Sequence, residues 1–263
     1  MSVITKVIRG LVRRGGYDVV RYFGEQPGAD PFIDMRRLLD GQMEPLVLDV
    51  GANVGQSVDR FRQAFPTCSV HSFEPSPSTY EKLRAHCENL ARVRTWNLGV
   101  GAANATLTFQ ENEFSAMSSF LMPGETGWGR VVRSTEVPVI TLDSFAKDQN
   151  IDFIHVLKSD TQGYDFEVFK GAKQLMAANC IGLIYYEVIF SEQYKHLPSF
   201  QEVFGYLLEH DFALVTFYDM FFQKGLVSWT DALFVNREFY QRMAKRGQRP
   251  DIVSRRLSGH ARV

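Results

Sequence analysis

The sequence predicts an α/β fold whose mostly parallel, seven-stranded sheet has helices on both faces and an antiparallel terminal strand. Short apolar runs alternate with stretches of helical periodicity, and a glycine-bearing turn joins the first run to a helix. Continuous apolar runs are typical of parallel strands that are covered on both faces. Two last apolar runs, 213–220 and 229–235, flank the short link 221–225, so we expect them to pair as an antiparallel hairpin.

The composition limits the function classes. The 263 residues suit one α/β domain with short appendages, and 45% hydrophobic with 22% charged residues is an ordinary globular mixture. The net charge of −1 indicates no nucleic-acid partner. Cys68, Cys87 and Cys180 are scattered along the chain and form no CxxC pair. This spacing indicates neither a disulfide framework nor a zinc site. We therefore take a reduced, cytoplasmic setting as the default. No apolar run approaches the roughly 18 residues that span a bilayer.

The termini differ from the central domain, which we place at residues 42–240. Residues 1–41 are predicted to be a helical extension, with apolar residues at helical spacing between basic ones. We expect its first helix to pack on the domain; the alternative is weak contact with an anionic membrane surface. Residues 241–263 are basic and predicted to be a flexible tail, with an acidic partner as the alternative. Nothing in the sequence indicates an oligomeric state.

The first candidate site lies in residues 46–57, LVLDVGANVGQS, which predict a buried strand, a tight turn and the start of a helix. Gly51 and Gly55 permit backbone conformations and close approaches that a Cβ would forbid. The helix that follows presents free N–H groups and the positive end of its dipole. This turn is therefore predicted to hold a nucleotide-like ligand, the alternative being a turn without one.

A carboxylate ends the next predicted strand, residues 69–74. Glu74 follows Asp49 by 25 positions, close to the spacing of about 20 that is typical of dinucleotide sites. A carboxylate in this place can accept hydrogen bonds from both hydroxyls of a ribose. The alternative is a solvated strand end.

The middle of the chain predicts a third strand at 93–99, part of a hairpin at 105–110 and a strand at 136–140. The polar, turn-rich segment 111–135 carries exposed apolar residues, among them Trp128. Long loops within a compact domain are usually functional, so we interpret it as a substrate lid; the alternative is a disordered excursion.

Two further carboxylates follow predicted buried strands. Asp160 comes at the end of the strand in 152–160, and Glu187 lies near the carboxyl end of 181–190. In an open parallel sheet, ligands bind outside the carboxyl ends of the strands. Both side chains are therefore expected beside the glycine turn of a Rossmann-like sheet.

Several strings resemble FkbM-type methyltransferases, a class I S-adenosylmethionine-dependent family, over roughly residues 46–236. They are LDVGANVGQS, FEPSPSTYEKL, NLGVG, TLDSF, LKSDTQGYDFEVFKGA, and YEV followed by DALFV. The LKxDxxGxxxxVxxGA pattern is the most specific of them. The resemblance implies the strand order 3-2-1-4-5-7-6, with an antiparallel seventh strand. It also implies methyl transfer to a hydroxyl of a sugar or glycan, a polyketide or another secondary metabolite.

The resemblance also implies a set of S-adenosylmethionine-binding residues. The residues matched to the methionine part and the ribose are Asp49, Gly51, Asn53 and Gly55. Glu74 is matched to the ribose hydroxyls. The adenine region is matched to Asn97 with the two residues after it. The family often carries Glu where this chain has Gln162 and Asp165. Because an amide side chain does not ionise, Gln162 is not expected to be an essential acid.

Methyl transfer to an alcohol is an in-line displacement that needs positioning and a general base. We predict Asp160 as the base, Glu187 as the second candidate and His196 as the third. Asp160 could instead hold a magnesium ion or cap a helix, and Glu187 could be a buried partner of Lys158. No metal-ligand spacing indicates a metal site.

Two other functions are left open by the residues alone. One is a non-catalytic nucleotide-binding module that has kept the fold. The other is an NAD(P)-dependent oxidoreductase, which the sequence disfavours because the third glycine of GxGxxG falls on Gln56.

Overall fold

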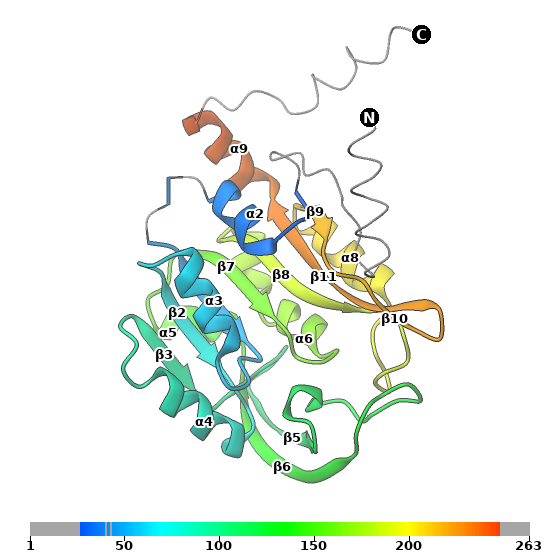
Figure 1. Ribbon diagram of the computed structural model, residues 1–263. Helices are drawn as coiled ribbons and strands as arrows, with labels where there is room; N and C mark the ends of the chain where they lie inside the picture. Colours follow the sequence, from blue (N-terminus) through cyan, green and yellow to red (C-terminus); the bar gives the residue numbers. More distant parts are fainter. Residues whose placement is uncertain (1–26, 40, 43, 248–263) are drawn as a thin grey trace, which may run out of the picture.

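The computed structural model describes residues 27–39, 41–42 and 44–247 (Figure 1). Its main sheet has eight strands in the order β10-β11-β8-β7-β1-β2-β3, with β9 paired to β11. Their bounds are β1 Leu46–Val50, β2 Ser69–Phe73, β3 Val93–Trp96, β7 Ile154–Ser159, β8 Ile181–Ile189, β9 Phe212–Phe217, β10 Phe221–Gln223 and β11 Leu226–Asn236.

The predicted fold class and strand order are confirmed. Strands β3, β2, β1, β7 and β8 run parallel, and β11 lies antiparallel between β8 and β9. Without the short β10, the seven strands of this sheet are β1, β2, β3, β7, β8, β9 and β11. Numbered 1 to 7 along the chain, they lie in the order 3-2-1-4-5-7-6, with an antiparallel seventh strand. The carboxyl ends of the five parallel strands therefore meet at one edge of the sheet.

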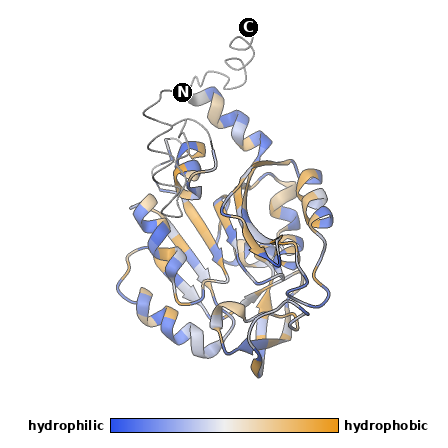
Figure 2. Ribbon diagram, turned by 45° about the vertical axis from the view of Figure 1, so that its right-hand side comes forward, coloured by the Kyte–Doolittle hydropathy of each residue, from blue (hydrophilic) through white to orange (hydrophobic). Residues whose placement is uncertain are grey.

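Helices cover both faces of this sheet (Figure 1). One layer contains α2 Pro31–Leu38, α3 Gln56–Ala64, α4 Pro77–Cys87 and α9 Arg237–Gly247; the other contains α5 Leu142–Asp148, α6 Asp165–Lys170, α7 Lys173–Ala177 and α8 Phe200–Glu209. Successive strand residues point to opposite faces of the sheet. Val47 therefore packs in the core under α2, α3, α4 and α9, while Leu48 packs in the core under the other four helices. Figure 2 shows hydrophobic residues along the central strands.

The terminal hairpin is longer than predicted. The link expected at 221–225 contains β10, and the turn is confined to Lys224 and Gly225, whose φ values of 49° and 82° are both left-handed. A two-residue turn of this kind lets the flanking strands pair directly. The predicted antiparallel pairing of the last two large strands, β9 and β11, is confirmed.

A second, three-stranded sheet is built from β4 Gly99–Val100, β5 Ala105–Asn112 and β6 Val131–Ile140, in the order β4-β6-β5. The third strand predicted at 93–99 is therefore wrong in its last part, because the chain leaves the main sheet after Trp96 and pairs with β6 instead. The β5–β6 pairing confirms the predicted hairpin. It also shortens the connecting segment to residues 113–130, which include the 3-10 helix η1 Ser115–Met117.

The helix predicted at the start of the chain and most of the predicted tail lie outside the described residues. The end of the extension is α2, which packs on the domain: its Phe32 ring meets that of Phe61 edge-on at 5.0 Å. The boundary placed at residue 240 falls inside α9, since Phe239 of this helix stacks on Phe153. Within the described part, no helix is long and apolar enough to cross a membrane.

Candidate active site

The turn between β1 and α3 depends on glycine. Gly51 has a φ of +74°, and a Cβ on it would lie 1.9 Å from the backbone oxygen of Asp160. Only glycine allows the β1 and β7 loops to approach this closely. Gly55, with a φ of +103°, begins α3, and a Cβ there would lie 2.7 Å from the His86 ring of α4. Gly51 therefore shapes the site, whereas Gly55 packs two helices together.

Asp49 lies beneath this turn and is fully buried. Its Oδ2 accepts hydrogen bonds from the hydroxyls of Ser57 (2.7 Å) and Ser72 (3.2 Å). The Lys158 ammonium lies 3.2 Å from Oδ1 of Asp49 and donates to the Gly51 carbonyl oxygen at 2.9 Å. The sequence assigned Asp49 to the cofactor, but these contacts make it a brace for the turn.

Lys158 is a residue that sequence reasoning did not assign to the site. Burial alone would lower the pKa of its ammonium, but the charges of Asp49 and Asp160 outweigh burial and raise the pKa above its usual value. The cation therefore stays charged between two carboxylates. The register that pairs Asp49 with Lys158 across β1 and β7 creates this contact, and no local sequence signal reveals it.

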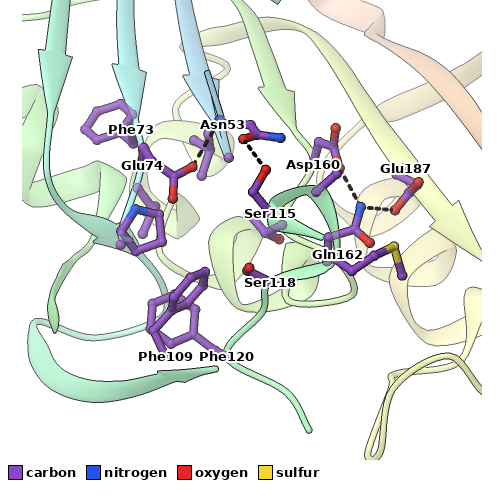
Figure 3. Close-up of a pocket in the computed structure, with 18 of the residues that line it drawn as sticks. Asn53, Phe73, Glu74, Phe109, Ser115, Ser118, Phe120, Asp160, Gln162 and Glu187 are labelled. Atoms are coloured by element: carbon purple, nitrogen blue, oxygen red, sulfur yellow. Dashed lines mark hydrogen bonds between the residues drawn. The ribbon is translucent and has the colours of Figure 1, made fainter. Parts of the chain in front are cut away.

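Glu74, directly after β2, lies where the sequence predicted it (Figure 3). Its Oε2 accepts from the backbone N–H of Asn53 (3.0 Å) and its Oε1 from that of Ser76 (2.9 Å). Burial raises the pKa of this carboxyl to about 7, against the opposing effects of the two backbone donors and Lys158. Each oxygen can accept a further hydrogen bond from a ligand.

Asn97 does not line the cavity beside Glu74. Its amide donates to the backbone oxygens of Glu74 (2.8 Å) and Pro75 (3.1 Å), so it fixes the turn after β2. The wall next to Glu74 is apolar instead and is formed by Leu98, Gly99, Val100, Phe109 and Phe120. This wall depends on the pairing of β4 with β6, which the sequence did not predict.

Asp160 and Glu187 are brought together by Gln162, as Figure 3 shows. The amide nitrogen of Gln162 donates to Oδ1 of Asp160 (3.0 Å) and to Oε2 of Glu187 (2.9 Å). Its amide oxygen accepts from the Tyr194 hydroxyl at 2.7 Å, which fixes the orientation of the amide. Gln162 is thus a neutral bridge between two acids.

The two acids have different environments. Burial raises the pKa of Glu187 well above its usual value, and the nearby charge of Asp160 raises it further. The Asp160 side chain is 43% exposed, and its Oδ2 lies 3.6 Å from the Lys158 ammonium. Asp160 therefore combines access to a ligand with a neighbouring cation, and Glu187 favours its protonated form.

The alternatives for these acids do not match the contacts. Helix α6 has Tyr164 as its N-cap and no side-chain cap, so Asp160 does not cap it. Glu187 bonds to Gln162, whereas the ion pairs of Lys158 are to Asp49 and Asp160. No group of three or more His, Cys, Asp or Glu side chains in the described part is placed to hold a metal ion.

His196, the third candidate base, is not brought to these acids. It lines a separate cavity between the 124–125 turn and the start of α8. Its backbone φ of 59° places it in a tight turn after β8. Of the three predicted bases, the structure therefore leaves Asp160 and Glu187 near the glycine turn.

The glycine turn and the two acids line two adjoining cavities, of about 270 and 280 Å³. Their shared lining is Gly51, Asn53, Ala116, Asp160 and Glu187. Together they fall in the range of about 300–1,000 Å³ that is usual for small-molecule sites. The first extends from Glu74 to β11, and the second lies against α2 and α3.

The segment 113–130 closes over the first cavity. The Ser115 hydroxyl donates to Oδ1 of Asn53 at 3.1 Å (Figure 3), and the Ser119 hydroxyl donates to the Gln162 backbone oxygen at 2.8 Å. The segment is therefore ordered and covers the turn and the acid pair. Its role as a substrate lid stays a prediction.

Glu74 follows β2, Asp160 follows β7 and Glu187 lies on β8, so all three acids lie near the glycine turn at the carboxyl edge of a Rossmann-like sheet. The family match defines the class of this site: the protein is a methyltransferase. Residues 49–214 match the methyltransferase FkbM domain. The chain therefore belongs to the FkbM methyltransferase family, and the prediction from the sequence is confirmed.

Three comparisons illustrate the likeness. The chain is 25% identical to 2-O-methyltransferase NoeI of Sinorhizobium fredii over 61% of this chain and 74% of the relative. It is 23% identical to hexuronic acid methyltransferase AglP of Haloferax volcanii over 52% of this chain and 55% of that relative, so it spans just over half of AglP. The solved METTL16 methyltransferase domain matches 89% of this chain and 79% of its own, with 8% identity and a TM-score of 0.46.

Proposed function

We propose that this protein is an S-adenosylmethionine-dependent O-methyltransferase that acts on a hydroxyl of a sugar or sugar-like acceptor. One observation carries the proposal. A single cavity is lined at one end by Glu74 and the β1–α3 turn, and next to them by the Asp160–Gln162–Glu187 bridge. A nucleoside-bearing donor and an alcohol acceptor can therefore meet beside an ionisable acid.

The chain fits the cofactor residue by residue. Glu74 presents two acceptor oxygens for ribose hydroxyls, already oriented by two backbone N–H groups. The close approach at Gly51 leaves backbone groups for the methionine part, together with Asn53. The apolar wall of Leu98, Phe109 and the neighbouring residues suits the flat adenine ring. Bound S-adenosylmethionine supplies an electrophilic methyl group on its sulfonium.

The chain's own residues then position the acceptor and take its proton. Asp160 is the proposed general base, because it lines both cavities and its side chain is 43% exposed. Gln162 holds one Asp160 oxygen, which leaves the other for the acceptor hydroxyl. Glu187, whose pKa burial raises well above its usual value, is the second candidate, and in its protonated form it can donate a hydrogen bond to the acceptor.

The acceptor class rests on the relatives. One is named for 2-O-methylation and another for a hexuronic acid, which is a sugar acid. A hydroxyl on a carbohydrate is the acceptor that both names allow. A secondary metabolite with a free hydroxyl is the other acceptor that the family resemblance permits.

The test combines calorimetry with a methyl-transfer assay on the purified protein. We expect S-adenosylhomocysteine to bind and NAD not to bind. With a panel of saccharides, Asp160→Asn should slow methyl transfer by about 100-fold or more, the usual contribution of a general base. Its affinity for S-adenosylhomocysteine should stay within about threefold, because Glu74 and the glycine turn are unchanged.

Glu187→Gln is the matched control, since it also replaces a carboxyl group that bonds to Gln162 by an amide. If it slows transfer more than Asp160→Asn does, the base is Glu187. Full activity in Asp160→Asn would remove Asp160 as the base. Binding of NAD without binding of S-adenosylhomocysteine would reject the proposed cofactor.

A further inference from the structure

Two of the three tryptophans of the chain line the first cavity. Trp128 lies in the segment 113–130, and Trp229 lies in β11. The third, Trp96, lies outside this cavity and stacks on His71, with 5.9 Å between the ring centroids. The proposed chemistry uses neither cavity tryptophan.

The strand order places the tryptophan pair far from the proposed ribose contact. Trp229 is in register with Ile189 of β8, and Glu74 follows β2. Strands β1, β7 and β8 separate β2 from β11, so the two ends of the cavity lie about 19 Å apart at about 4.8 Å per strand. Asp160, directly after β7, and Glu187, on β8, lie between them. A donor held at Glu74 therefore leaves the β8–β11 end for the acceptor.

We propose that Trp128 and Trp229 form the acceptor subsite and hold a pyranose ring by stacking. This inference rests on the proposed function and specifies the ring form of its acceptor. One face of many pyranoses presents C–H groups, which are attracted to the negative face of an aromatic ring. An acyclic polyol offers no such flat face.

The indoles are arranged as a corner. Their centroids lie 5.4 Å apart and their planes meet at 87°. Phe221 of β10 stacks on Trp229 at 4.8 Å and 8°, which fixes that indole from one side. Trp128 is 51% exposed, so part of its surface can contact a ligand. Gln193, itself buried, lines the same cavity, and its amide nitrogen donates to the Ser228 hydroxyl at 3.2 Å.

Backbone hydrogen bonds hold this corner in place before any ligand binds. The N–H of Gly124 donates to the Gln193 oxygen at 2.7 Å, and that of Thr126 donates to the Glu192 oxygen at 3.1 Å. The amide of Asn112 donates to the Trp128 backbone oxygen at 2.9 Å. The segment is thus tied both to the chain after β8 and to β5. Such preorganisation lowers the entropic cost of binding.

The competing explanation is that the tryptophans only close the lid by packing on each other. Tryptophan emission separates the two explanations without relying on turnover. In a Trp96→Phe background, all emission comes from Trp128 and Trp229. We would saturate this protein with S-adenosylhomocysteine and titrate it with methyl glucopyranoside, methyl glucuronoside and, as the acyclic control, sorbitol.

We expect at least one pyranoside to change the emission saturably and sorbitol not to. Adding Trp128→Ala or Trp229→Ala should weaken pyranoside binding, measured by calorimetry, by about three- to tenfold, because each variant removes a stacked aromatic ring. Phe at either position should restore part of the affinity, and S-adenosylhomocysteine affinity should not change. If Trp229→Ala fails to fold, Trp128→Ala and Phe221→Ala provide the same test.

Unchanged pyranoside affinity in both alanine variants would overturn the inference. So would equal binding of sorbitol, or no pyranoside binding by a protein that binds S-adenosylhomocysteine; in these cases the proposed cofactor use stands. Failure to bind S-adenosylhomocysteine at all would overturn the proposed function itself, and with it this subsite.

Discussion

The strongest quantitative prediction concerns the pH dependence of cofactor binding through Glu74. Burial raises the pKa of this carboxyl to about 7, and its two oxygens already accept the N–H groups of Asn53 and Ser76. Two ribose hydroxyls would bring the number of donors to four. A protonated carboxyl has one acceptor position fewer and adds a donor of its own, so it must lose at least one of these bonds.

The expected change in cofactor affinity with pH follows from the fraction of Glu74 that is ionised. With a pKa of about 7, this fraction falls about tenfold between pH 8 and pH 6. If the ionised form binds the cofactor, the affinity for S-adenosylhomocysteine should fall about tenfold over this range, or by about 1.4 kcal/mol. In Glu74→Gln the affinity should be weaker at pH 8 and should lose this pH dependence.

Calorimetry at pH 6, 7 and 8, in two buffers of different ionisation enthalpy, measures both the affinity and the protons released. The wild-type protein should release about 0.9 proton per ligand at pH 6 and about 0.1 at pH 8 through this group. Subtracting the Glu74→Gln profile removes the titration of the ligand's own amine and of other acids. An identical pH profile in the variant and the wild type would refute the assignment of Glu74.

The same shift predicts how stability depends on pH. Glu74 binds its proton more tightly in the folded protein than in the unfolded chain, where its pKa is about 4.5. The folded state therefore holds more protons between pH 4.5 and 7, and its stability falls as pH rises through this window, by about 3 kcal/mol at most. Denaturant unfolding of the ligand-free protein should show this slope, and Glu74→Gln should reduce it.

The remaining predictions concern the framework beneath the site. Gly51→Ala should lower the melting temperature by several degrees and abolish S-adenosylhomocysteine binding, because its Cβ would lie 1.9 Å from the Asp160 oxygen. Gly205→Ala in α8, where a Cβ meets nothing within 4 Å, is its control and should stabilise the protein by about 0.5–1 kcal/mol; the opposite ranking would contradict the reasoning. Lys158→Met should cost about 3–5 kcal/mol in chemical unfolding, since it leaves Asp49 buried without a cation, and a loss below about 1 kcal/mol would show that this brace is dispensable.

The sequence predicted the fold and the region of the site well, for a physical reason. Alternation of apolar runs with helical periodicity is local, and parallel strands joined by helices bring their carboxyl ends to one edge. That rule is sufficient to place Glu74, Asp160 and Glu187 near the same glycine turn. The order of the family strings added the activity, which the pattern of strands and helices alone does not determine.

The roles of several residues depended on contacts that the sequence does not encode locally. Asn97 was expected at the adenine, but its amide bonds to the backbone after β2. Gly99 leaves the main sheet to build the wall that the adenine would meet. A strand switch of this kind is determined by pairing with residues some 40 positions away, so strand periodicity could not reveal it.

The sequence by itself determined an FkbM methyltransferase with its acids at the carboxyl edge of the sheet. Only the tertiary structure decided what each group does there: Lys158 pairs with Asp49, Gln162 joins Asp160 to Glu187, and two distant tryptophans meet at the far end of the cavity. The reason is that secondary structure follows from neighbours along the chain. The charge state and orientation of a buried side chain follow instead from neighbours in space.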